Sequence, residues 1–76
     1  MAIEFEVQRL QVGDVILVDL PEHSGEVEAK VVREIDRIDR IDRAESTVRV
    51  TLRVEGRDDF VREWALDEMV TVVRGP

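Results

Sequence analysis

The side chains that could support catalysis gather in one short segment. His23 is the only histidine of the chain, and Glu22, Ser24 and Glu26 stand close to it in the sequence. Such a histidine would act as a general base or a metal ligand. Nucleophilic catalysis, however, needs a nucleophile, a base and an orienting group brought together. The segment lacks such a set, so we predict an ordinary solvated loop and no catalytic residue.

Carboxylates for a metal ion are present, but they follow no recognisable spacing. They occur around the same loop and in two later pairs: Asp19, Glu22, Glu26, Glu28, Asp58, Asp59, Asp67 and Glu68. They lack the spacing of an EF-hand loop, and a chain without cysteine has no thiolate zinc site. The glycines stand singly, so they form no phosphate-binding loop. We therefore predict a non-catalytic protein with no metal and no cofactor.

Binding has clearer candidates. Trp64 shares one face of a predicted strand with Phe60 and Arg62, and tryptophan and arginine are enriched at the energetic centres of interfaces. The alternative is that Trp64 packs in the core. Arg49 and Arg53 lie two steps of alternation apart on the preceding strand, so our hypothesis aligns them with Arg62 in an arginine strip on the outer surface. The alternative for this strip is a solvated charged face.

The triplet Ile-Asp-Arg occurs three times in succession, in residues 35–43. A period of three fits neither a strand nor an α-helix well. We predict that a strand continues to about Ile38 and that residues 39–46 form a mobile loop, with a short helix as the alternative. Ile38 and Ile41 would be a costly apolar display in a solvated loop. They are therefore candidates for contact with a partner or a second copy.

Strands must position these candidates, because apolar and polar residues alternate along much of the chain. The alternation is clearest in residues 47–54, and a turn at 55–59 leads to a second strand-like run at 60–65. Together they predict an antiparallel hairpin. The remaining elements are an N-terminal strand or arm within 1–11, strands at 15–19, 27–38 and 70–74, and a 3₁₀ turn at 66–69.

Three segments resemble the SH3-like small β-barrels of the KOW and Tudor type. They are Val12–Val18, where a Gly-Asp turn opens a strand, Gly25-Glu26-Val27, and the ending Trp64–Val73. The resemblance implies an all-β fold: a five-stranded SH3-like barrel with an extra N-terminal strand and a 3₁₀ turn before the last strand. Residues 1–76 would form this single domain.

The usual activities of that superfamily do not follow from the resemblance. Its proline-peptide grooves and methyl-lysine cages need several aromatic side chains, whereas this chain has only Phe5, Phe60 and Trp64. Its RNA-binding members use basic loops, whereas the loop at 20–26 is acidic. The resemblance therefore implies a fold and removes three of the functions that usually accompany it.

The size and charge of the chain limit the kinds of partner that we expect it to bind. A chain of 76 residues allows one domain with a small core. The net charge of −7 disfavours nucleic acid, although a local basic strip stays compatible with it. The longest apolar run, Val15–Val18, is too short for a bilayer, and residues 1–10 show no signal peptide, so we expect a cytoplasmic protein without membrane contact.

We predict a binding module for protein–protein interaction, with self-association as one form of it. The alternative is a nucleic-acid-associated accessory domain that uses the arginine strip.

Overall fold

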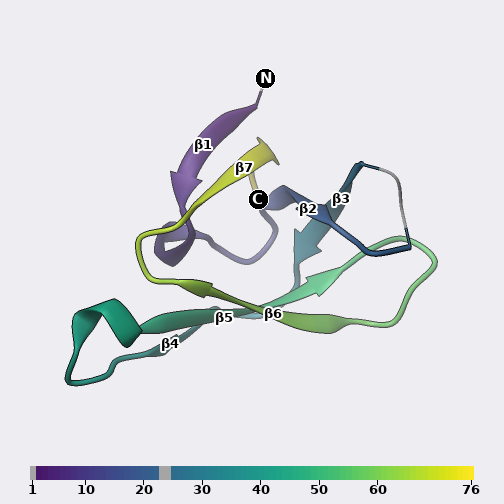
Figure 1. Ribbon diagram of the computed structural model, residues 1–76. Helices are drawn as coiled ribbons and strands as arrows, with labels where there is room; N and C mark the ends of the chain where they lie inside the picture. The colour runs from purple at the N-terminus through teal and green to yellow at the C-terminus, as the bar shows by residue number, and fades with distance from the viewer. Residues whose placement is uncertain (1, 23–24) are drawn as a thin grey trace.

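The computed structural model describes residues 2–22 and 25–76. Within these ranges the chain forms strands joined by turns and short 3₁₀ segments, and no α-helix (Figure 1). The strands are β1 (Ile3–Glu6), β2 (Val15–Asp19), β3 (Glu26–Val31), β4 (Asp36–Ile38), β5 (Thr47–Arg53), β6 (Phe60–Ala65) and β7 (Met69–Arg74). The predicted all-β class is confirmed. The seven described strands exceed the five-stranded barrel with one added strand that the sequence predicted.

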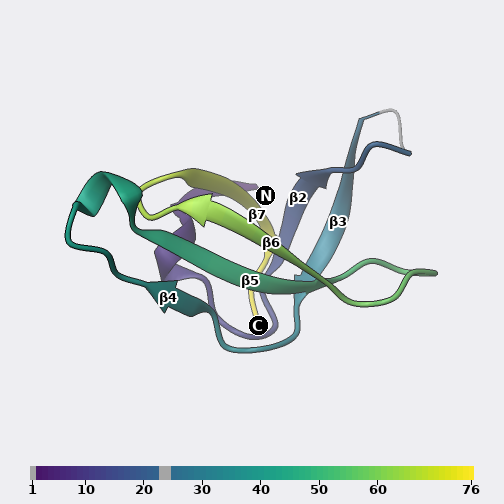
Figure 2. The same ribbon diagram turned by 60° about the horizontal axis from the view of Figure 1, so that its bottom comes forward.

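The strands form one antiparallel sheet that curls into a half-barrel. Its order is β1-β7-β2-β3-β5, and β6 lies along one edge of β5 while β3 and β4 share the other. The curl gives two layers, with β1, β7 and β2 in one and β4, β5 and β6 in the other (Figures 1 and 2). Within the described residues no ladder joins β6 to β7, so the barrel stays open on that side.

The core lies between these layers and follows directly from the alternation in the sequence. Val48, Val50 and Leu52 of β5 are fully buried, as are Ile16 of β2 and Val31 of β3. The residues between them on β5 are half-buried or exposed. Burying such aliphatic side chains stabilises the fold by roughly 1.5–3 kcal/mol each.

A bent turn starts β2. Gly13 has a φ of 99°, which a glycine adopts at no steric cost, and the buried Asp14 carboxylate accepts the backbone N–H of Gln11 at 2.8 Å. Val31 donates to the Asp14 carbonyl and accepts from the Gly13 N–H, both at 2.8 Å. Gly13 and Asp14 therefore lie together opposite the single residue Val31, which is the pattern of a β-bulge. Such a bulge bends the strand. The Gly-Asp turn expected from the resemblance is present here.

Three predicted elements need correction. The N-terminal strand ends at Glu6, because Val7–Arg9 forms a 3₁₀ turn that buries Val7 completely. The predicted 3₁₀ turn before the last strand is instead a four-residue turn, closed by the Glu68 N–H donating to the Ala65 carbonyl at 3.1 Å. The strand predicted over residues 27–38, with a bulge or bend at the Val31-Val32 doublet, is interrupted there and resumes only as β4.

The segment predicted as a mobile loop, residues 39–46, contains a hydrogen-bonded 3₁₀ turn, η2 (Arg43–Glu45). The Asp42 carboxylate accepts the Ala44 N–H at 3.0 Å, and the Ser46 hydroxyl accepts the Arg40 N–H at 3.0 Å. This is a short form of the helical alternative. Its mobility stays a prediction.

Candidate functional site

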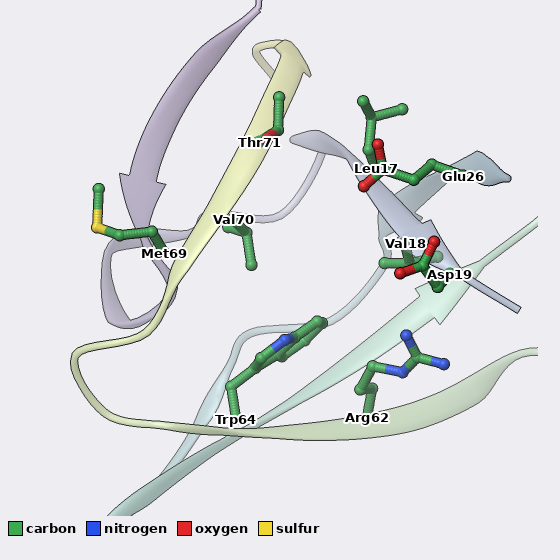
Figure 3. A pocket seen from close by; sticks show the side chains of 9 residues that line it. All are labelled: Leu17, Val18, Asp19, Glu26, Arg62, Trp64, Met69, Val70 and Thr71. Atoms are coloured by element: carbon green, nitrogen blue, oxygen red, sulfur yellow. The ribbon is translucent and has the colours of Figure 1, made fainter.

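A cleft of about 210 Å³ lies between β6 and the ends of β2 and β7 (Figure 3). It exists because the ladder between β2 and β7 holds only two residue pairs and ends at Ile16 opposite Val72. Beyond that pair the two strands share no ladder. The lining side chains are Leu17, Val18, Asp19, Glu26, Arg62, Trp64, Met69, Val70 and Thr71.

Trp64 forms one wall of the cleft and also packs against the core. Its side chain is half-buried and contacts the hydrophobic cluster. Trp64 thus combines the two alternatives of the sequence analysis, a residue packed in the core and a residue exposed to a partner. The indole N–H has no hydrogen-bond partner among the described residues, and no buried polar side-chain atom there lacks one. The N–H therefore reaches solvent. The ring offers an apolar face with a polar edge, which suits an interface.

Arg62 reaches into the same cleft. It lies opposite the fully buried Val50 in the ladder, which places it on the inner face with Trp64. Its guanidinium points toward Asp19 across the opening (Figure 3). In residues 2–22 and 25–76 it forms no ion pair within 4.0 Å. Arg62 is thus a cation available inside an open groove.

The predicted arginine strip is wrong, because Arg49 and Arg53 lie on the opposite face from Arg62. The register pairs Arg49 with Glu63, and alternate residues of a strand point to opposite faces. Glu63 lies beside Arg49, with its Oε1 at 3.8 Å from the Arg49 Nε. The outer face is therefore one of mixed charge.

Arg53 is more tightly held than Arg49. Its Nε and Nη2 donate to the two carboxylate oxygens of Asp59 at 2.8 and 3.0 Å. These hydrogen bonds lower the pKa of the Asp59 carboxyl below its usual range and raise the pKa of Arg53. The pair joins the end of β5 to the start of β6 and stabilises the hairpin turn. It leaves Arg53 less free to meet a phosphate.

Carboxylates line the rim of the cleft. Asp19 and Glu26 are direct cross-strand partners of β2 and β3, and neither is ion-paired within the described part of the chain. Glu4 and Glu6 of β1 are not among these rim residues, because they pair with Thr71 and Met69 on the face of β7 opposite to the buried Val70 and Val72. Like charges placed directly opposite each other destabilise a sheet. Asp19 and Glu26 therefore form an electrostatically unfavourable pair at the mouth of the cleft.

The free edge of β6 adjoins these residues. The Leu66 N–H points toward β5, since it donates to the Ser46 carbonyl at 3.2 Å. The Ala65 N–H points the other way and donates to Glu68 Oε2 at 3.3 Å. Backbone groups alternate in direction along a strand. Val61 and Glu63, two and four residues before Ala65, therefore direct their N–H and C=O groups away from β5. No described strand pairs with them.

The three isoleucines of the triplets have different environments. Ile35 packs against the core, Ile38 is half-buried in β4 opposite Thr47, and Ile41 is fully exposed beside η2. None of them lines the cleft. The predicted interaction residues are thus distributed over four places: the cleft, the outer face of β5, strand β4 and the segment before η2.

The predicted catalytic and metal-binding candidates offer little chemistry. His23 and Ser24 lie outside the described residues, and Glu22 pairs with Arg57 at 3.1 Å. Among the residues described, no group of three or more metal-ligating side chains converges. The Thr71 hydroxyl in the cleft has no hydrogen-bonded base there. In the same residues, no helix has the length and apolar character to cross a membrane.

Arg62 and Trp64, two of the predicted interaction residues, line the cleft, whereas sequence reasoning did not place Asp19, Glu26 and Met69 in the same lining. Those three come from strands that adjoin the cleft only because of the short β2–β7 ladder. No family model matches the chain, and the comparisons with curated proteins and with solved structures found no match.

Proposed function

We propose that this protein is a non-catalytic module of the SH3-like barrel class that binds another protein through the cleft between β6 and the β2–β7 pair. The strand order β7-β2-β3-β5-β6 supports the SH3-like assignment. Strands β1 and β4 are then additions to the five-stranded barrel. A cysteine-free chain suits a reducing compartment, and the proposal places the module in the cytoplasm.

One observation carries this proposal: a half-buried tryptophan whose polar edge reaches solvent stands beside an unpaired arginine in an open groove. Tryptophan is enriched among the residues that dominate binding energies, and the charge of the neighbouring Arg62 influences which partner the groove selects. The neighbouring strand edge has free backbone groups, which a partner segment can pair with. The cleft is also too small for most small-molecule ligands, whose sites occupy about 300–1,000 Å³.

The test compares three purified proteins: wild type, Trp64→Ala and Arg49→Ala. Partners enriched from the source cells by wild type are purified, and their affinities for all three proteins are measured by calorimetry. We expect Trp64→Ala to lose about tenfold or more in affinity and Arg49→Ala to change it by less than about threefold. Equal losses in both variants would place the binding surface elsewhere.

The same proteins separate the other functions. Binding to RNA or DNA at low salt that weakens on Arg49→Ala and Arg53→Ala, and not on Trp64→Ala, would favour the nucleic-acid-associated alternative. A molar mass that doubles with concentration in wild type alone would favour self-association through the cleft.

A further inference from the structure

We infer that the occupant of the cleft is an extended, positively charged segment of a partner protein, which pairs with the free edge of β6 and lays a lysine or arginine side chain on Trp64 between Asp19 and Glu26. This inference rests on the proposed function and specifies its partner.

The extended form follows from β6. Val61 and Glu63 direct two N–H and two C=O groups to solvent, and only a strand satisfies such groups in a regular way. A strand added at this edge continues the curl of the sheet. Its alternate side chains then point to the inner side, next to Arg62 and Trp64, because strand side chains alternate between faces.

The positive charge follows from the rim. Asp19 and Glu26 are cross-strand partners in the lining of the cleft, and neither forms an ion pair within the described chain. The single cation in the lining is Arg62, so carboxylates outnumber it. A lysine or arginine entering the cleft relieves the repulsion between Asp19 and Glu26. It also meets the face of Trp64, where a cation is attracted to the ring.

Charge also argues against a second copy of this chain as the occupant. Each copy carries a net charge of −7, so two copies repel each other. A basic partner avoids this repulsion.

Arg62 takes an unexpected part in this arrangement. Its guanidinium extends toward Asp19 (Figure 3) and would compete with an incoming cation for the same carboxylates. Removing its charge should therefore strengthen the binding of a basic segment. An arginine that itself anchors the partner would give the opposite result, a loss of affinity.

The probes are three synthetic peptides of equal length. One alternates lysine with threonine, one alternates glutamate with threonine, and one has the lysines of the first in a single block followed by glycine and threonine. Trp64 is the only tryptophan, so its fluorescence reports occupation of the cleft. Hydrogen exchange of the Val61 and Glu63 amides reports pairing with β6. We expect the first peptide to change both signals and the second to change neither.

Four variants then locate the charge effect. Asp19→Asn with Glu26→Gln should weaken the alternating lysine peptide by about fivefold to tenfold. Glu34→Gln with Glu45→Gln removes the same charge from exposed positions outside the cleft and should weaken it by less than twofold to threefold, the size expected of screened surface charge. Arg62→Gln should tighten binding by about twofold to fivefold. Arg49→Gln, on the outer face, is its matched control and should have little effect.

Several outcomes would overturn the inference. The first is an equal loss of affinity for the alternating lysine peptide in the two carboxylate double variants. The second is weaker binding of that peptide by Arg62→Gln. The third is that the block peptide protects the Val61 and Glu63 amides from exchange as well as the alternating peptide does. If instead an uncharged or acidic partner occupies the cleft, and Trp64→Ala lowers the affinity for it, the inference fails while the proposed function stands. If partners bind at another surface, both fail.

Discussion

Arg62 lies directly opposite Val50 in the β5–β6 ladder, although the Val50 side chain is fully buried. A guanidinium on the inner face of a curled sheet is tolerated only where the barrel is open, because a closed core would strip it of water. The position of Arg62 and the existence of the cleft are therefore two aspects of one feature.

The first prediction concerns the energetic cost of this arginine. Arg62 has no ion pair within 4.0 Å in the described structure, so Arg62→Met keeps the apolar stem and removes a charge that no close carboxylate holds. We expect the free energy of unfolding to stay the same or to rise by up to about 1 kcal/mol. Arg49→Met, which breaks the exposed pair with Glu63, should lower it by about 0.2–1 kcal/mol. Urea denaturation measures both, and a clear loss in Arg62→Met would contradict the assignment.

The second prediction tests the electrostatics of the cleft without any ligand. The half-buried Trp64 is bordered by Asp19 and Glu26, so a cationic quencher should reach the indole more readily than an anionic one. We expect caesium to quench the fluorescence more strongly than iodide, relative to free tryptophan. The preference should shrink in Asp19→Asn with Glu26→Gln and persist in Glu34→Gln with Glu45→Gln. A preference for iodide would show that Arg62 dominates the local field.

A third prediction follows from the lowered pKa of Asp59. The hydrogen bonds from Arg53 favour the ionised carboxyl in the folded state. Asp59 therefore contributes stability above the pKa of an unfolded aspartate, about 3.9, and this contribution is lost as pH falls through the lower folded pKa. We expect Asp59→Asn to be less stable than wild type at neutral pH. The two proteins should converge in strong acid, as urea denaturation at several pH values would show.

The Asp59 experiment has its control in Asp58→Asn. Asp58 is the exposed neighbour of Asp59 and no ion pair holds it within the described chain. Its stability difference from wild type should be small and should not grow between acid and neutral pH. If the free energy of unfolding depends on pH in the same way for Asp59→Asn and wild type, the ionised Asp59 carboxyl makes no contribution to stability.

The fourth prediction separates backbone strain from steric conflict at two glycines. Gly13 and Gly25 have φ values of 99° and 100°, but a Cβ on Gly13 would lie 2.9 Å from the Cβ of Pro76, whereas that on Gly25 meets open space. Gly25→Ala should cost about 1–3 kcal/mol for its backbone conformation alone. Gly13→Ala should cost more, and removing Pro76 should recover the difference. Equal losses of stability in Gly13→Ala and Gly25→Ala would show that Pro76 moves aside without a measurable energetic cost.

The fifth prediction uses the triplets as an internal series. Ile35 contacts the core, Ile38 is half-buried and Ile41 is fully exposed. Alanine substitutions should therefore lower the free energy of unfolding most at Ile35, less at Ile38 and by less than about 0.5 kcal/mol at Ile41. Thermal denaturation ranks the three. A large loss at Ile41 would mean that this side chain is covered in solution, for instance by a second molecule.

The sequence predicted the hairpin of β5 and β6 well, because strict alternation in residues 47–54 can only satisfy a sheet with one buried face. It misplaced Arg62 relative to Arg49 and Arg53. Phe60 pairs with Leu52, so the face that carries Phe60 and Trp64 is the inner one and Arg62 belongs to it. The alternative in which Trp64 packs in the core already conflicted with an outward Arg62, because the two residues share one face of the strand.

The cleft itself could not be predicted from local patterns. It depends on where the β2–β7 ladder ends, which is set by the bend at Gly13 and Asp14 and by an irregular register beside Val15. The predicted all-β class needed only alternation, whereas the openness of the barrel depends on contacts between residues almost sixty positions apart. The η2 turn had a local signal in the Asp42 side chain, which caps Ala44.

The Glu68 carboxylate limits how many residues of a further strand can pair with the free edge of β6. By covering the Ala65 amide, it ends the accessible part of β6 after Val61 and Glu63. An edge with two open backbone positions, flanked by a tight turn, is too short to template the endless stacking of identical chains that produces fibrils. The molecule can thus leave this edge of β6 open in a crowded cell and still resist polymerisation through it.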